Sequence, residues 1–441
     1  MGSVQKILYY SFGLGMTSPL LALVLGGHII SLTTVTIALV FVDLLLCRHC
    51  TRCSYDKKSL YSKYFLIWMI ISLVSSIFGF VYFIGLQKEF ALSSISFMPK
   101  ILFYIILFFF FARDAYGEDK MEVVFKGIKF GILLNLVWAI VDASMYYTIG
   151  ESLTNNVFKS YIIAADMPNG LASTVDGLSI RSVGLNNDEA TIGFFSICAV
   201  VYSFLYKKLW LTVVGILATF SSVTFIGVVG ITCAFIWQFL LRKKTKHKLR
   251  NIIIVFAFGF AAFIYVNNSN NDIIVGLRTA IELRAESKKD GDHSAEARKL
   301  FITKFPACVK QLPTSLMIGT GYNSAVYAYY QEGLEYSRFS KTNPKPTAIE
   351  NTYIEYFFDL GFFGLLFFLL LYYKIFTDSL RIYNKYKIEF YALIYVYTFG
   401  AIFEFAFYHN ILYSMDMIVC IAAVLYLNEN SKQCTAIKAQ K

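Results

Sequence analysis

The sequence predicts an all-α polytopic membrane protein with about twelve transmembrane helices. Of its 441 residues, 57% are hydrophobic and only 16% are charged, and the mean hydropathy is +0.57, far from the values of soluble domains. Apolar runs long enough to cross about 30 Å of hydrocarbon recur along the chain, at 7–27, 29–46, 64–86, 95–112, 123–148, 189–206, 251–266, 352–373, 389–408 and 410–427.

A further apolar stretch, residues 209–241, is too long for one span and short for two. Two lysines precede it and a basic run at 242–250 follows it, and basic clusters favour the cytoplasmic side. The stretch therefore enters and leaves on the same side, either as two short helices that turn at Ser221 and Ser222 or as a re-entrant hairpin buried in protein. Counted as two helices, it brings the expected total to twelve.

The basic residues also predict the orientation. With twelve spans, both termini and the basic clusters of the short loops face the cytoplasm, so much of the net charge of +11 is an orientation signal and requires no nucleic-acid partner. No cleavable signal peptide is expected, because the first apolar run leads straight into a second. The expected organisation is helices one to five at 1–148, an external loop at 149–188, helices six to nine at 189–266, a larger external loop at 267–351, helices ten to twelve at 352–427, and a cytoplasmic tail at 428–441.

The two external loops are where we expect the chemistry, because a carrier that only moves solute has little need of so large a loop. In this topology Cys308 is the one cysteine of eight that faces outward, so no disulfide is expected there. The cluster CRHCTRC at 47–53 has metal-like spacing. Flanking cations oppose a metal ion, and basic juxtamembrane thiols are the alternative. We expect no metal and no cofactor.

Four acidic residues lie inside the expected spans, where a charge is costly and is by default a functional candidate. They could relay protons in a transporter; the alternative is that they lie near span ends or are hydrogen-bonded within the bundle. They are Asp43, Asp142, Glu404 and Asp416.

The first external loop ends in a polar cluster beside a span. Arg181 lies a few residues before the span that starts near Glu189, and Asn186, Asn187 and Asp188 lie between them. This arrangement places a guanidinium beside carboxylates and amides at the outer membrane surface. On its own, it is typical of an ion pair that fixes a loop.

The second external loop has its own arginines. Arg278 and Arg284 come first, and a helix capped by Asp292 or Ser294 is then expected to place Arg298 in its first turns. Backbone N–H groups at a helix start, together with a guanidinium, make an anion site. A Gly-x-Gly turn follows at 318–323, and with Tyr322 a series of aromatic residues begins that would either stack on sugar rings or form an interfacial belt.

The external loop meets the next span in TAIENTYIEYFFDLGFFGLL, residues 347–366. Three carboxylates, Glu350, Glu355 and Asp359, precede an unbroken run of hydrocarbon. Glu355 and Asp359 lie within the helix and are expected to serve in packing or ion pairs.

These local patterns resemble the O-antigen polymerase and O-antigen ligase superfamily of bacterial membrane glycosyltransferases, which have a GT-C-type fold. Three patterns carry the resemblance, and all lie outside and beside a span. The first is Arg-x-x-Gly followed by two asparagines; the second is an arginine early in an external helix that leads to a Gly-x-Gly turn; the third resembles the ligases' His-Asn, nine residues, Gly-x-x-Gly pattern. In this chain they are Arg181, Gly184, Asn186 and Asn187; Arg298, Gly319 and Gly321; and Asn351, Gly361 and Gly364.

Two departures refine the resemblance. Glu350 stands where the ligase pattern has histidine, which favours a Wzy-type polymerase. Ser221 and Ser222 lack the arginine often found in the paired short helices, so no role is assigned to that site.

The resemblance implies transfer of a glycan from undecaprenyl pyrophosphate to a sugar hydroxyl, on the periplasmic face of the inner membrane, without ATP or metal. It implies that Arg181 and Arg298 clamp the leaving pyrophosphate, with Arg278 or Arg284 assisting. Glu350 is the expected general base or acceptor-orienting group, because desolvation raises a carboxylate's pKa; a helix N-terminal carboxylate is the structural alternative. Other expected substrate-binding residues are Asn186, Asn187, Asp188, His293, Asn351 and Tyr322.

Three functions follow as alternatives. A polymerase of O-antigen or capsule repeat units is expected first, an O-antigen ligase acting on lipid A-core second, and a flippase for the same lipid-linked unit third. A chain-length regulator and a flippase are the protein partners that the resemblance implies.

Overall fold

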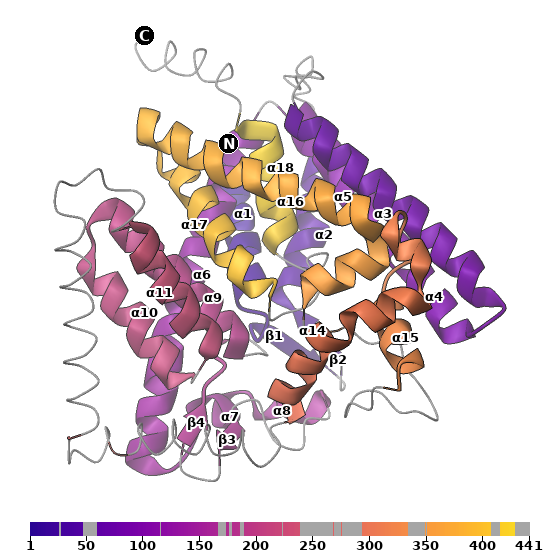
Figure 1. Ribbon diagram of the computed structural model, residues 1–441. Coiled ribbons are helices and arrows are strands. Elements are labelled where there is room, and N and C mark those ends of the chain that lie inside the picture. The colour runs from indigo at the N-terminus through magenta and orange to yellow at the C-terminus, as the bar shows by residue number, and fades with distance from the viewer. Residues whose placement is uncertain are drawn as a thin grey trace, which may run out of the picture. The chain divides into compact units, whose positions relative to one another are not determined.

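The computed structural model (Figure 1) describes residues 1–25, 28–46, 60–114, 116–165, 173–175, 179–185, 189–222, 224–238, 293–333, 351–406 and 415–427, with the single positions 268, 275 and 349. The cysteine cluster at 47–53, the expected span at 251–266 and the tail at 428–441 lie outside these residues.

Helices dominate the described chain, and four stretches are long and apolar enough to cross a membrane. These are Tyr61–Ile84 in α3, Lys88–Arg113 in α4 and α5, Gly117–Ile149 in α6 and Thr352–Tyr386 in α16. Shorter apolar helices are Leu32–Leu45, Ala190–Tyr206, Leu209–Ser221, Ile226–Ile236 and Met415–Tyr426. A helical, polytopic membrane protein is thereby confirmed, and the number twelve stays a prediction.

The chain divides into two compact units. Unit 1 comprises Met1–Tyr9, Ile37–Phe125 and His293–Lys441, and unit 2 comprises Tyr10–Thr36 and Lys126–Asp292. Three helices have residues in both units, namely α1 (Ser3–Thr17), α2 (Leu32–Leu45) and α6 (Gly117–Ile149).

Unit 1 is built around a long helix, α16 (Thr352–Tyr386), that packs on α3 and α17. Trp68 of α3 lies between Tyr356 and Phe368 of α16, with ring centroids 6.1 and 5.4 Å away. The other elements are α3 (Leu60–Ile84), α4 (Lys88–Ser96), α5 (Met98–Arg113), α14 (His293–Gln311), the 3-10 helix η2 (Pro313–Leu316), α15 (Ser324–Gln331), α17 (Glu389–Glu404) and α18 (Met415–Tyr426). Because α17 is apolar on every side, it is buried almost throughout.

An ionic cluster links α1, α2 and α6 with Asp114 at the end of α5. The ammonium of Lys120 lies 2.7 Å from carboxylate oxygens of both Asp43 and Asp114. Asp43 also accepts hydrogen bonds from Gln5 (2.9 Å) and the Tyr9 hydroxyl (2.8 Å). Of the four acids inside expected spans, Asp43 is therefore paired, as buried charges usually are.

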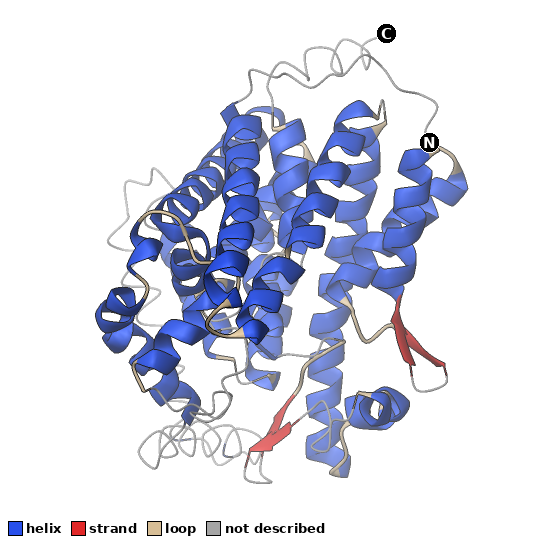
Figure 2. Cartoon of the chain, turned by 90° about the vertical axis from the view of Figure 1, so that its right-hand side faces the viewer, coloured by secondary structure: helices blue, strands red, loops and turns tan. Residues whose placement is uncertain are grey.

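Unit 2 contains two short antiparallel hairpins, drawn red in Figure 2. In the first, β1 (Ala22–Leu25) pairs with β2 (His28–Ser31), so that Ala22 lies opposite Ser31. The expected spans at 7–27 and 29–46 are thus wrong in their bounds, because α1 ends at Thr17. Pro19 explains the early end, since the residue before a proline is disfavoured in a helix. The second hairpin pairs β3 (Ser173–Val175) with β4 (Ser179–Arg181).

The helices of unit 2 after the second hairpin pack as a group of three. Both α10 (Leu209–Ser221) and α11 (Phe225–Ile236) lie against α9 (Glu189–Tyr206). Thr224 caps α11, its hydroxyl accepting the Gly227 N–H at 3.2 Å, and a Cβ on Gly193 of α9 would lie 2.8 Å from that same nitrogen. The described part of 209–241, for which the sequence left two forms open, thus contains two short helices, and Thr224 caps the second.

Candidate functional site

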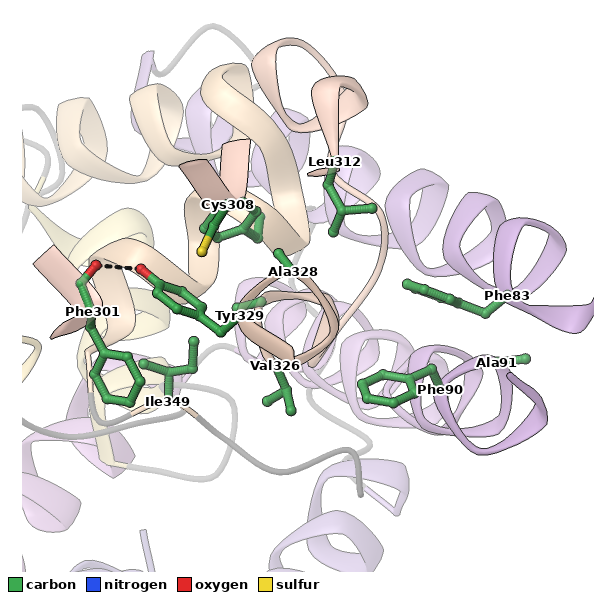
Figure 3. Packing of buried hydrophobic residues seen from close by; sticks show 12 residues of the cluster. Phe83, Phe90, Ala91, Phe301, Cys308, Leu312, Val326, Ala328, Tyr329 and Ile349 are labelled. Atoms are coloured by element: carbon green, nitrogen blue, oxygen red, sulfur yellow. Dashed lines mark hydrogen bonds between the residues drawn. The ribbon is translucent and has the colours of Figure 1, made fainter. Parts of the chain in front are cut away.

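The helix that carries Arg298 is held by a hydrophobic cluster at one end of unit 1. Arg298 lies in the second turn of α14, which begins at His293. Further along α14, Phe301 and Cys308 are buried, and so is Leu312 just after the helix ends. Together with residues of α3, α4, α15 and α16 they form the cluster of Figure 3, whose members are Phe83, Phe90, Ala91, Phe301, Cys308, Leu312, Ala325, Val326, Ala328, Tyr329, Ile349 and Phe358.

Two contacts in this cluster fix α14 against its neighbours. The Tyr329 hydroxyl of α15 donates a hydrogen bond to the Phe301 carbonyl of α14, the dashed line of Figure 3. The Phe305 ring lies 5.6 Å from that of Phe358 in α16. Burial raises the pKa of the Cys308 thiol to about 12, so the thiol is protonated and serves in packing. These contacts hold α14 from Phe301 onward, three residues after Arg298.

The Gly-x-Gly turn at 318–323 is docked onto a break in α16. Gly361 has a φ of 77° and a ψ of 175°, which divides the helix in two. Such a break leaves the carbonyls of the preceding turn without intrahelical partners, and the turn supplies donors to them. The Thr320 N–H bonds the Phe358 carbonyl at 2.9 Å, and the Gly321 N–H bonds that of Asp359 at 3.1 Å.

The Asp359 side chain completes this docking. It accepts hydrogen bonds from the N–H groups of Asn323 and Ser324, each at 3.1 Å, and from the Ser324 hydroxyl at the same distance. The N–H groups of the turn are therefore used within the protein. Asp359, expected to serve in packing or an ion pair, thus accepts hydrogen bonds from the backbone and hydroxyl of the docked segment.

Tyr322 is packed inside unit 1. Its ring is 2% exposed and stacks on Phe97, with centroids 4.3 Å apart and planes inclined by 11°. A face covered in this way cannot stack on a sugar ring. The expected substrate contact of Tyr322 is therefore replaced by a role in the core.

Hydrogen bonds fix the two residues on either side of Glu350, just before α16 begins at Thr352. Ile349 is fully buried and donates its N–H to the Glu355 carboxylate at 2.9 Å. The Asn351 side chain caps the helix, accepting the Ile354 N–H at 3.0 Å and donating to the Ala406 carbonyl at 3.2 Å. Asn351, expected to bind substrate, thus has both side-chain groups engaged in holding the helix start. Glu350 itself lies outside the described residues.

In unit 2, the segment after Arg181 is tied to α6. Arg181 is the last residue of β4. The Ser182 hydroxyl donates to Asp142 at 2.7 Å, and the Leu185 N–H donates to the Asn135 side chain at 2.8 Å. Gly184 has a φ of 65°, and a Cβ there would lie 3.0 Å from the Asn135 amide oxygen. Both the positive φ and the close approach of Asn135 favour glycine at position 184, the glycine of the Arg-x-x-Gly pattern.

Asp142 organises the same loop. It accepts hydrogen bonds from the Ser152 hydroxyl (2.9 Å), the Thr154 N–H (3.0 Å) and the Ser182 hydroxyl. Asp142 is therefore hydrogen-bonded within the bundle, which is the alternative that the sequence offered to a role as a proton relay. Asn135 is the residue that sequence reasoning missed, and an asparagine in the middle of an apolar helix was the available signal.

Several expected site residues lie outside the described part of the chain. They are Arg278, Arg284, Asn186, Asn187, Asp188 and Glu350. Arg298 and His293 belong to unit 1 and Arg181 to unit 2. Within the described residues, no three or more His, Cys, Asp or Glu are grouped so as to hold a metal ion.

Part of the chain is similar to a known protein family. The family model described as O-antigen ligase matches residues 208–369, a stretch that contains α10, α11, α14, the docked turn and the broken start of α16. No curated protein matches the chain. The match supports placement in the O-antigen ligase and polymerase superfamily, and with it a glycosyltransferase-like role in polysaccharide biosynthesis at a membrane.

Proposed function

We propose that the protein is a polysaccharide polymerase that transfers a glycan from an undecaprenyl-pyrophosphate donor to the terminal sugar of another lipid-linked repeat unit. The observation that carries this proposal is the match of the O-antigen ligase family over residues 208–369, the stretch that holds Arg278, Arg284, Arg298 and Glu350. The glutamate at position 350, where the ligase pattern has histidine, favours the polymerase within that superfamily.

The reaction needs stabilisation of a leaving pyrophosphate. The bond between the donor's anomeric carbon and the phosphate oxygen breaks, and its electron pair leaves with the pyrophosphate. Guanidinium groups stabilise this charge by paired hydrogen bonds and need no metal. In the proposal Arg181 and Arg298 form this clamp, and Arg278 or Arg284 assists. The anchoring of α14 by Phe301 and Tyr329 supports a pre-positioned Arg298, because preorganised charge is the effective kind.

The acceptor hydroxyl must lose its proton as it attacks the anomeric carbon. Glu350 takes this proton in the proposal, with Asp188 and His293 as the other candidates. Its two neighbours in the chain, Ile349 and Asn351, are held by hydrogen bonds to Glu355 and Ala406 where α16 begins. Asn186 and Asn187 are proposed to contact the substrate beside Arg181.

The proposed location is the bacterial inner membrane, with both termini in the cytoplasm and the site on the periplasmic face. A chain-length regulator and a flippase of the same pathway are the proposed protein partners. The donor supplies all the energy of transfer, so no cofactor is proposed.

A ligase is the second candidate, because the matching family model is itself described as an O-antigen ligase. Electrophoresis of surface polysaccharide from a strain deleted for the gene separates the two. A polymerase predicts that a ladder collapses to core plus one repeat and that the wild-type gene restores it. Loss of all glycan from the core, with lipid-linked polymer accumulating outside, would establish the ligase instead. Accumulation of lipid-linked units on the cytoplasmic side would exclude both and indicate a flippase.

A further inference from the structure

We propose that residues 313–321 are a re-entrant element of the membrane domain, inserted between α3 and α16, with Leu316, Met317 and Ile318 against lipid hydrocarbon. The sequence assigns these residues to an external loop in water. The inference rests on how deep this segment lies along the two membrane helices that it contacts, and it is independent of the catalytic function.

The end of unit 1 from which the segment enters is defined by the hydrophobic cluster. Phe83, next to the end of α3 at Ile84, has its ring centroid 5.0 Å from that of Tyr327 in α15. Ile349, just before α16 begins, is in the same cluster. The end of α3 and the beginning of α16 therefore lie at the same end of the unit, and α14 and α15 lie there too.

From that end, the Gly-x-Gly turn reaches well down both helices. The Gly321 N–H bonds the Ser75 hydroxyl at 3.1 Å, and Ser75 is about 14 Å along α3 from Ile84 at 1.5 Å per residue. On the other side, a Cβ at Gly361 would lie 2.5 Å from the Met317 carbonyl oxygen, and Gly361 is about 14 Å along α16 from Thr352. Both helices give the same depth, close to half of a hydrocarbon layer of about 30 Å.

Several N–H groups of the segment bond protein carbonyls, as this depth requires; those of Met317 and Ile318 bond the Thr314 carbonyl. Irregular backbone within the membrane is tolerated only where protein covers its hydrogen-bonding groups. The N–H groups of Thr320 and Gly321 bond carbonyls of α16. Ser75 presents a small side chain to the turn and Gly79 presents none. A Cβ on Gly79 would collide with the Thr320 carbonyl, so close packing of the two backbones needs glycine at that position of α3.

The side chains that face away from the protein are apolar. Leu316, Met317 and Ile318 are 54%, 63% and 49% exposed, three consecutive large apolar residues of a kind that soluble loops seldom present. They continue the exposed apolar surface of the adjoining membrane helices, to which Phe362 and Phe363 of α16 belong. This continuity identifies the occupant as the hydrocarbon of the bilayer.

Cysteine labelling tests the depth. Met317→Cys and Leu316→Cys are compared with Gln331→Cys and Thr303→Cys, which replace exposed residues of α15 and α14 in the same loop. Cys308 is fully buried, so wild type gives a low background with a membrane-impermeant maleimide applied to spheroplasts. We expect positions 316 and 317 to react at least tenfold more slowly than 331 and 303, and equally fast in SDS. Equal rates in spheroplasts would place the segment in water and overturn the proposal.

A photoreactive side chain then identifies what covers the segment. Benzoylphenylalanine at position 317 in proteoliposomes of a defined phospholipid is expected to give a phospholipid adduct by mass spectrometry, as it should at Phe362, while at Gln331 it should not. A peptide adduct at 317 would show that protein covers the site and would overturn the proposal. So would the absence of a lipid adduct at 317 where position 362 gives one.

Discussion

Asp359 and Ser324 are joined twice, because both the N–H and the hydroxyl of Ser324 donate to the same carboxylate oxygen at 3.1 Å. One of these residues lies inside a membrane helix and the other begins a helix of the large external loop. The pair links the helix whose start adjoins Glu350 to the turn that follows α14, the helix that carries Arg298.

Asp359→Asn should loosen this link. The amide group replaces one carboxylate oxygen with a donor, which opposes an N–H of Asn323 or Ser324, and an unsatisfied buried donor costs about 1–3 kcal/mol. We expect a lower midpoint of thermal unfolding in detergent and reduced activity. Glu89→Gln is the control, because Glu89 is an exposed acid at the start of α4 in the same unit. Equal midpoints for the two variants would show that the Asp359 contacts contribute nothing.

Gly361→Ala should be more damaging than an ordinary glycine substitution. The residue has a φ of 77°, and a Cβ would lie 2.6 Å from the Gly319 nitrogen, so both backbone strain and collision with the turn are expected, at about 1–3 kcal/mol for the strain alone. Gly85→Ala is matched to it, since a Cβ there meets nothing within 4 Å. Yield and thermal stability after purification measure the difference, and a Gly361→Ala protein as stable as Gly85→Ala would contradict the structure.

The arginine clamp predicts that charge alone is insufficient. Arg298→Lys and Arg181→Lys should each lower turnover about a hundredfold, the scale of losing one transition-state donor, because lysine cannot replace a bidentate guanidinium. Protein abundance should stay normal. Arg381→Lys, at an exposed arginine that pairs with Asp378 at 3.1 Å, is the control and should retain activity. Near-normal chain synthesis by both clamp variants would remove the clamp from the mechanism.

The rate at which the buried Cys308 thiol is alkylated should depend on pH. Burial disfavours the thiolate and raises the thiol pKa to about 12, so at pH 8 roughly one thiol in ten thousand is the reactive anion. Alkylation of the folded protein should therefore be slow and rise about tenfold per pH unit from pH 7 to 10, whereas Gln331→Cys should level off near pH 9, as an ordinary thiol does. A levelling-off of wild type at pH 9 would show that Cys308 is accessible to water.

The membrane class could be predicted because it depends on composition, and the helix at 189–206 because most of its residues after Glu189 are apolar. The early end of α1 was harder to foresee, since the apolar run continues beyond Pro19 into a hairpin. Hydropathy measures how long a run is, whereas a single proline decides where its helix stops.

The sequence showed less of the contacts that hold the turn and the start of α16 together. Asp359 and Gly361 stand in one helical stretch, and nothing local shows that a turn some forty residues earlier binds there. The same holds for Asn135, whose partners include the Thr17 carbonyl and the Leu185 N–H, which belong to two other segments. Long-range backbone contacts of this kind leave no periodic pattern in the sequence, which is why Tyr322 and Asn351 were expected to bind substrate.

Reconstitution of glycan transfer tests the central claim most directly. Purified protein in liposomes is given a synthetic undecaprenyl-pyrophosphate repeat unit, and the lipid-linked products are separated by length. The account predicts that wild type releases undecaprenyl pyrophosphate and forms dimers and longer chains in the presence of EDTA, and that Arg298→Ala and Glu350→Gln do not. Two results would contradict it. In one, correctly folded wild-type protein leaves the lipid-linked monomer unchanged; in the other, both variants extend the chains.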